Sequence, residues 1–524
     1  MARLGRTAAP IIAMLILGLV SAYSLLNQDF MVAVICIVIA LTIAFFHMSL
    51  LRPPGRIKFN ITYVSAILHM YGIATGEAGP KELVGVISET EEYGALRSIF
   101  RRIKVLAEKF GYGFTRATSI VAQATKPPLK DFLMRCTEIF SSRRPRDYLE
   151  IEVNTVIEEY AGMYTRALDN LRLMGGIFIT FQSTVIFIVI TISIFTIFLA
   201  ESSLIYLSYA ISLLSLILLF LGFRNVPPKD PLFYKGEETP RSHKLFAHML
   251  AITPIFIVPS VILCLLNEIP VAFAILGVGV LIPGLFAYSL ERFINNVESY
   301  YPVFIKAVSE HLISISDLKS VFSYVLYMEL GPLKRLVNKA LNRLRLGISA
   351  EETINLFSSE TGSHSIHIAD RIFLDAFRRG GDIVEVGKKL SNFVVKVLEL
   401  RKRRLSVARS FEIMVMIMQP LIVILMVLLT GVLDFFSSLL INIPFFTFGK
   451  IPLGFIRTTN AAITLLLAFL NSLAVNDARG GYWGSSLLYA GILLLVSSLS
   501  WLLTEQFIVA YFTGISSDLW RTVI

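Results

Sequence analysis

Residues 401–433 read RKRRLSVARSFEIMVMIMQPLIVILMVLLTGVL, so a basic stretch passes directly into an apolar one. Between residues 411 and 433, Glu412 is the only ionisable side chain. A helix that crosses roughly 30 Å of hydrocarbon needs about 20 mainly apolar residues, and basic residues collect at the cytoplasmic ends of such helices. The stretch therefore predicts a membrane-spanning helix that leaves the cytoplasm just after its basic residues.

The rest of the chain has the same character. It contains 524 residues, of which 55% are hydrophobic and 16% are charged, and its mean hydropathy is +0.69. This composition excludes an ordinary soluble protein. Nine stretches are apolar enough to span a membrane as helices: 8–26, 30–51, 175–200, 203–223, 246–266, 269–290, 411–433, 458–475 and 485–508.

The distribution of Lys and Arg predicts the orientation in the membrane. With the amino terminus in the cytoplasm, cytoplasmic segments hold 45 of the 48 Lys and Arg residues, and only Lys450, Arg457 and Arg521 lie outside. An odd number of spans then places the carboxyl terminus outside. We expect a multi-pass protein of the cell membrane.

The spans divide the chain into five parts. Residues 1–51 form an amino-terminal hairpin, 52–174 a first cytoplasmic helical domain, and 175–290 four spans with a short cytoplasmic loop at 224–245. Residues 291–410 form a second cytoplasmic helical domain, and 411–524 three spans with an external loop at 434–457. The predicted fold class is therefore all-α.

The two cytoplasmic segments, called here the first and second modules, show helical periodicity. Ser349-Ala-Glu-Glu352 and Asp382-Ile-Val-Glu385 are typical of capping boxes at helix starts. Each module ends in a long amphipathic helix, over 145–174 and 382–409, that leads into a span.

The modules also resemble each other in sequence, which indicates a duplicated unit. The matched segments are Tyr93-Gly-Ala-Leu-Arg97 with Leu330-Gly-Pro-Leu-Lys334, Gly113-Phe-Thr115 with Gly347-Ile-Ser349, and Arg146-Asp-Tyr-Leu149 with Arg379-Gly-Gly-Asp-Ile-Val384. Chance similarity between two Leu-rich helical segments is the alternative explanation.

Motifs for catalysis are missing from the sequence. It contains no phosphate-binding Gly-x-x-x-x-Gly-Lys-Ser/Thr loop and no His-Glu-x-x-His. His364, His367 and Asp370 have a spacing that could face one metal ion, but a polar helix start is the better interpretation. The three cysteines, Cys36, Cys136 and Cys264, do not have the spacing of a metal site. We therefore expect neither a metal nor a cofactor, and no enzymatic activity.

Basic clusters are the remaining candidates for function, as docking surfaces for an acidic cytoplasmic partner or for anionic membrane lipid. Arg401, Lys402, Arg403 and Arg404 flank a span and are interpreted as membrane anchors. Arg378 and Arg379 lie far along the chain from any span, so they favour contact with an acidic partner. Interleaved exposed aromatic residues are lacking, which argues against nucleic-acid binding.

The order of elements resembles the membrane platform proteins of type IV pilus and type II secretion systems, the F-domain family. The residues that carry the resemblance are Gly381, Asp382, Ile383, Glu385 and Gly387, followed by a long exit helix. The resemblance covers about residues 58–434. Nine spans are more similar to the archaeal form, found in archaella and adhesive pili. The first module departs from the pattern, because no glycine precedes Asp147.

This resemblance implies a non-enzymatic platform for filament assembly. Its cytoplasmic modules would contact a hexameric assembly ATPase, and its membrane part would pass pilin-like subunits to the filament above it. The platform could be a homodimer of this chain. The expected ATPase-facing residues are Arg378, Arg379, Asp382, Glu385 and Lys388.

A polytopic transporter or channel with cytoplasmic regulatory domains is the alternative, and a membrane enzyme ranks third. A transporter would need a polar path through the spans. The spans hold few polar groups, among them Gln182, Gln419, Asn471 and Glu505. A half-broken helix at Gln419-Pro420 would favour the transporter.

Overall fold

A computed structural model describes residues 60–76, 78–199, 203–315, 317–440 and 452–523. Every regular element in these ranges is a helix, apart from an isolated bridge between Phe233 and Ser363. The expected all-α class is therefore confirmed. Seven helices are long and apolar enough to cross a membrane, and they contain seven of the nine predicted spans. The other two, 8–26 and 30–51, lie outside the described residues.

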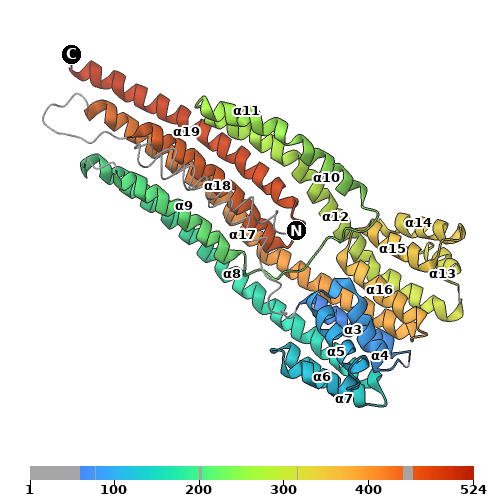
Figure 1. The fold of residues 1–524 in the computed structure, drawn as a ribbon. Coiled ribbons are helices and arrows are strands. Elements are labelled where there is room, and N and C mark those ends of the chain that lie inside the picture. The colour runs from blue at the N-terminus through green and yellow to red at the C-terminus, as the bar shows by residue number, and fades with distance from the viewer. Residues whose placement is uncertain (1–59, 77, 200–202, 316, 441–451, 524) are drawn as a thin grey trace.

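The first module is a bundle of short helices that ends in one very long helix (Figure 1). Its helices are α3 (Ile61–Ala74), α4 (Pro80–Glu89), the 3-10 helix η1 (Glu91–Tyr93), α5 (Ala95–Glu108), α6 (Phe114–Gln123) and α7 (Leu129–Ser141). The long helix α8 (Pro145–Leu199) has 55 residues and runs without a break from the module into the membrane bundle.

The second module has the same order of helices. It begins on the C-terminal half of α12 (Ile269–Ser314) and continues with α13 (Leu318–Val325), α14 (Leu333–Arg345), α15 (Ala350–Thr361) and α16 (His364–Arg378). It ends in α17 (Ile383–Leu440), a helix of 58 residues that also runs into the bundle. The matching order of short helices, followed by one long exit helix, supports the duplication expected from the sequence.

The membrane bundle is completed by α9 (Ser203–Phe223), α10 (Arg241–Ile252), α11 (Pro254–Leu265), α18 (Leu453–Arg479) and α19 (Ser485–Val523). Helices α10 and α11 together form one span with a break at Thr253-Pro254. Helices α12 and α19 approach closely, because a Cβ on Gly284 would lie 2.2 Å from the backbone nitrogen of Leu488. Small residues allow such contact between membrane helices.

Two details of the expected topology are wrong. The loop expected at 434–457 is shorter, since α17 extends to Leu440 and α18 begins at Leu453. The helix expected to break at Gln419-Pro420 is continuous, with Pro420 inside α17. Neighbouring helices hold a membrane helix together at a proline, and here the Gln419 amide donates to Ser497 Oγ on α19 at 3.2 Å.

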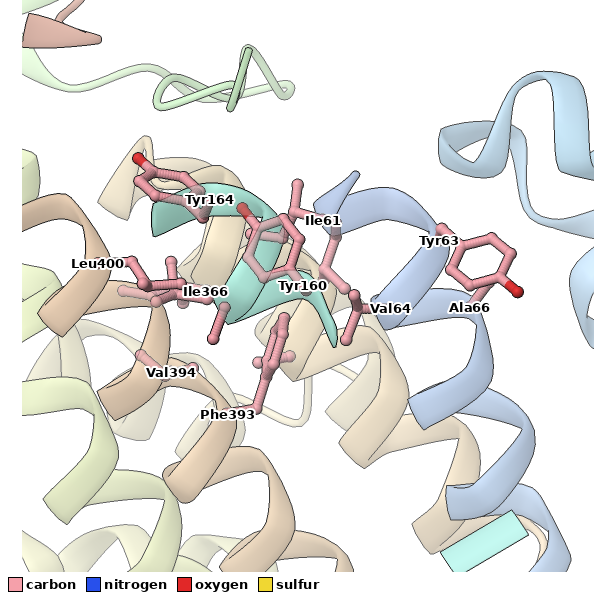
Figure 2. Packing of buried hydrophobic residues seen from close by; sticks show 14 of the residues in the cluster. Ile61, Tyr63, Val64, Ala66, Tyr160, Tyr164, Ile366, Phe393, Val394 and Leu400 are labelled. Carbon is pink, nitrogen blue, oxygen red and sulfur yellow. The ribbon is translucent and has the colours of Figure 1, made fainter. Parts of the chain in front are cut away.

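The two modules share one hydrophobic core rather than forming separate domains. Figure 2 shows Ile61 and Val64 of α3 beside Tyr160 of α8, with Ile366 of α16 and Phe393 of α17 packed against them. All five side chains are at most 5% exposed. Burial of such large side chains contributes about 1.5–3 kcal/mol each, so the modules are strongly held together. The division of the chain at 52–174 and 291–410 therefore describes sequence segments and not independent bodies.

Candidate functional site

The turn between α16 and α17 carries most of the residues expected to face a partner. Gly380 has a φ of +70°, a conformation that favours glycine. Gly381 lies against the end of α3, where an added Cβ would come within 2.7 Å of Thr75 Oγ1. The Asp382 backbone N–H donates to the same hydroxyl at 3.1 Å. The turn is therefore attached to the first module.

The start of α17 forms only half of the expected capping box. The Asp382 carboxylate accepts from the Glu385 backbone N–H at 3.1 Å, as an N-cap residue should. The Glu385 side chain does not reach back, because the Asp382 N–H is already bound to Thr75. It accepts instead from the Tyr71 hydroxyl of α3 and the Arg146 guanidinium of α8. The Glu385 side chain thus makes its contacts within the chain.

A series of ion pairs continues along α8 and α17. Arg146 also lies 3.8 Å from the Asp382 carboxylate. One turn further on, Lys389 Nζ lies 3.0 Å from both Glu150 Oε1 and Asn154 Oδ1. The starts of the two duplicated long helices therefore face each other, and their charges are complementary. We call this series, from Arg146 to Lys389, the α8–α17 clasp.

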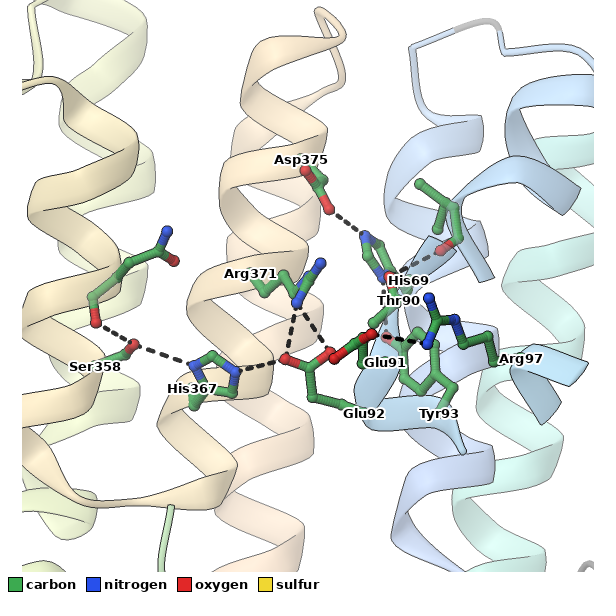
Figure 3. A network of polar contacts seen from close by, with 12 residues as sticks. His69, Thr90, Glu91, Glu92, Tyr93, Arg97, Ser358, His367, Arg371 and Asp375 are labelled. Carbon is green, nitrogen blue, oxygen red and sulfur yellow. Dashed lines mark hydrogen bonds and ion pairs between the residues drawn. The ribbon is translucent and has the colours of Figure 1, made fainter. Parts of the chain in front are cut away.

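A second polar contact between the modules is centred on Glu92 of η1 (Figure 3). Its carboxylate accepts from Arg371 at 2.8 Å and lies 3.0 Å from His367 Nε2, both on α16. Partial burial alone would raise the pKa of Glu92. The His367 hydrogen bond and the Arg371 charge outweigh it and hold this pKa at about 2. The carboxylate is therefore ionised at neutral pH and attracts α16.

His69 of α3 forms a third contact in the same view. Its Nε2 lies 3.0 Å from an Asp375 carboxylate oxygen on α16, and its Nδ1 lies 2.9 Å from the Tyr93 hydroxyl. Complete burial lowers the pKa of His69, so the ring is neutral at neutral pH. Burial would raise the pKa of Asp375, but the His69 bond and nearby guanidinium groups lower it on balance.

Two of the three residues with metal-like spacing, His367 and Asp370, have separate protein partners. His367 Nδ1 lies 3.2 Å from Ser358 Oγ. The Tyr234 ring stacks on the His367 ring, with 3.6 Å between the two ring centroids. Asp370 accepts from the Tyr301 hydroxyl at 2.7 Å. Burial lowers the pKa of His364 to about 4. In the described part of the chain, no three His, Cys, Asp or Glu side chains come together as a metal site. Ser363 caps the start of α16, accepting from the Ile366 N–H at 3.1 Å, which agrees with the polar helix start.

The remaining expected partner residues point outward. Arg378 is exposed and lies 2.5 Å from Glu351, while Arg379 and Lys388 are also exposed. These cations flank the α16–α17 turn. Arg146 was not assigned to this site from the sequence, although its place in the duplicated pattern, opposite Arg379-Gly-Gly-Asp382, was the available signal.

The basic segment before the α17 span divides into two kinds of side chain. Lys402 and Arg403 are exposed, as membrane-flanking residues would be. Arg401 turns inward to the fully buried Glu298 of α12 at 2.6 Å. Arg404 is 4% exposed and donates to the carbonyl oxygens of Asp477 and Ala478 at the end of α18. The segment therefore also joins α17 to two other helices.

Several polar groups inside the membrane bundle, Gln419 and Asn471 among them, are bound to one another. Asn471 donates to Gln419 Oε1 at 2.9 Å, and this amide bonds on to α19. Near the ends of the spans, Glu412 pairs with Arg479 at 2.7 Å and Glu505 with Arg457 at 3.0 Å. Such bonds join helices within a bundle.

Comparisons with known proteins point in one direction. No family model and no solved structure matches the chain. It is 24% identical over 363 residues to flagella accessory protein J of Methanocaldococcus jannaschii, covering 63% of this chain and 62% of that protein. The chain thus spans less than two thirds of that relative's length. It is 23% identical over 454 residues, 81% of each chain, to flagella accessory protein J of Methanococcus voltae. The chain is a multi-pass membrane protein similar to these two flagella accessory proteins.

Proposed function

We propose that this protein is a non-enzymatic membrane platform on which a type IV pilus-like filament is assembled. In this proposal a cytoplasmic hexameric ATPase binds the joined modules, and the membrane bundle transmits its motion to the filament subunits. The amino terminus lies in the cytoplasm and the carboxyl terminus outside. The observation that carries the proposal is the continuity of α8 and α17, which connect the shared core directly to the bundle.

The similarity to flagella accessory proteins supports a role in such a filament. The orientation is supported by charge, since Arg224, Arg404 and Arg479 gather at the module-facing ends of the spans, around Asp477 and Glu412. Basic residues prefer the cytoplasmic side. The unbroken α17 counts against the transporter interpretation of Gln419-Pro420, because transport sites are typically built on interrupted helices.

The proposed ATPase-facing surface comprises Arg378, Arg379 and Lys388, which are exposed around the α16–α17 turn. Asp382, at this turn, is also exposed and completes the surface. Glu385 serves this surface indirectly, because its bonds to the first module hold α17 in place.

The test reverses two charges in the full-length chain, as Arg378→Glu with Arg379→Glu. We expect at least a tenfold loss of co-purified ATPase and a matching loss of filaments, because acidic partner groups would be repelled. The control is Lys126→Glu with Lys130→Glu, two exposed cations of the first module, which should keep both. If the first variant folds and retains both ATPase binding and filaments, the assignment is wrong.

A further inference from the structure

A large cleft opens between the start of α10 and the basic helix α14. Its volume is about 1340 Å³. One wall is the segment from Glu238 to Lys244, and the other is the segment from Gly331 to Lys339. Apolar side chains also line it, among them Phe293 of α12 and Leu336 of α14. We call it the α10–α14 cleft.

The cleft has a strong excess of positive charge. Its lining contains five cations and two carboxylates. Both carboxylates already have partners, since Glu238 lies 3.2 Å from Lys244 and Glu360 lies 2.8 Å from Arg343 and 3.1 Å from Lys339.

The other three cations in the lining are Arg241, Lys334 and Arg335, and all three are exposed. Within the described ranges, no carboxylate forms an ion pair with any of them. Three uncompensated cations on facing walls create a positive potential in the cleft, and such a potential attracts an anion.

The position of the cleft indicates where that anion comes from. Arg241 is the first residue of the span formed by α10 and α11. Of the most apolar 18-residue stretch of this span, only 6% is buried inside the protein. Side chains such as Ile255, Val258 and Leu265 are exposed in the part of the chain that the structure describes, and their apolar character suits contact with lipid. The cleft lies at the module-facing end of this span. Figure 1 shows the start of α10 near α14.

We propose that the α10–α14 cleft binds the phosphate of an anionic lipid headgroup. Arg241, Lys334 and Arg335 contact the phosphate, and the apolar lining beside them accepts the glycerol end of the lipid. Basic pockets at the membrane surface recognise lipids in this way. The bound lipid would join α14 of the second module to the membrane beside α10. A free phosphate has the same chemistry, so the test distinguishes these two sources.

The experiment uses the purified full-length chain in detergent, titrated separately with dioleoyl phosphatidylglycerol, dioleoyl phosphatidylcholine and inorganic phosphate. Native mass spectrometry counts the bound molecules. We expect the first phosphatidylglycerol to bind at least tenfold more tightly than phosphatidylcholine. Binding of inorganic phosphate with no preference for phosphatidylglycerol would identify free phosphate as the ligand and overturn the lipid proposal.

The cleft variant is Arg241→Gln with Lys334→Gln and Arg335→Gln. Its first phosphatidylglycerol should bind on the order of a hundredfold more weakly, the effect of three cations near an anionic surface. The control, Arg101→Gln with Arg102→Gln and Lys109→Gln, removes the same charge from exposed positions of α5 and its C-cap and should bind normally. Unchanged binding in the cleft variant, or an equal loss in the control, overturns the proposal.

A charge-preserving variant, Arg241→Lys with Lys334→Arg and Arg335→Lys, separates loss of binding from loss of folding. It keeps all three cations, so we expect affinity within about threefold of the natural chain. If this variant elutes as a folded protein and still loses the phosphatidylglycerol preference, charge is not what the cleft recognises.

Discussion

Single buried carboxylates of the second module differ in how their charge is compensated. Glu298 is fully buried and lies 2.6 Å from the Arg401 guanidinium. Asp370 is also buried, but its one bond comes from the neutral Tyr301 hydroxyl. Burial raises the pKa of Asp370 to about 8, since an unpaired charge is costly in a low-dielectric interior. Asp370 is therefore protonated in the folded protein at neutral pH.

This difference predicts a pH dependence of stability. The folded pKa of Asp370, about 8, lies above its unfolded value, so the folded state holds a proton that the unfolded state releases. Stability then falls as pH rises toward 8. We expect the natural chain to lose about 2 kcal/mol of unfolding free energy between pH 6 and pH 8. Asp370→Asn should not show this loss, and thermal unfolding across the range measures it.

Asp375→Asn is the matched control for this prediction. The pKa of Asp375 is lowered, so this group does not titrate between pH 6 and pH 8. Its variant should therefore keep the pH slope of the natural chain. Equal slopes for the natural chain and Asp370→Asn would show that Asp370 is ionised in the fold.

Among the elements, the long helix α17 packs closely against α12 near its start. Gly387 of α17 faces Ser309 of α12, and a Cβ at this position would lie 1.8 Å from Ser309 Oγ and 2.4 Å from Ser309 Cβ. Ser309 Oγ is itself bound to the Ile305 carbonyl at 2.6 Å, so it cannot easily move away. The absence of a side chain at residue 387 sets the distance between these helices.

We therefore expect Gly387→Ala to destabilise the protein by about 1–3 kcal/mol, the usual cost of overpacking. Gly85→Ala in α4 is the matched control, because a Cβ there would have no atom within 4 Å. Alanine is the better helix former, so this control should gain up to about 1 kcal/mol. Chemical denaturation of both purified variants gives the comparison; equal effects would refute the packing argument.

For the molecule as a whole, the modules act as one body that is attached to the bundle by three continuous helices, α8, α12 and α17. Their contact combines the shared apolar core with the α8–α17 clasp and the Glu92 and His69 contacts. The apolar core holds the modules together, whereas the ion pairs determine how α8 and α17 align. Any force on the modules therefore reaches the membrane helices directly.

A charge swap tests the alignment. Arg146→Glu or Glu385→Arg alone should place like charges together and open the start of α17, while the double variant restores an attractive pair. For a partly exposed pair we expect about 1 kcal/mol, or roughly a fivefold rise in hydrogen–deuterium exchange at the α17 start in each single variant. If the double variant exchanges as fast as the single ones, the two side chains are not coupled.

Much of this architecture could be predicted from the sequence. The apolar stretches, the helical modules, their duplication and the long exit helices follow from local patterns, because hydrophobic periodicity and span length are properties of neighbouring residues. The candidate site was predicted only in part. Arg378, Arg379 and Lys388 are exposed around the expected turn, but Glu385 binds Arg146, which lies 239 residues away along the chain.

The sequence by itself thus determined that 401–433 is a basic segment leading into a span, and that a second, similar unit precedes it. Tertiary structure alone decided that the two modules share a core, that Arg401 and Arg404 turn inward, and that α17 continues through Pro420. The physical reason is the range of the interactions. A local pattern shows which side chains are polar or apolar, whereas packing across the chain selects the partner that each one meets.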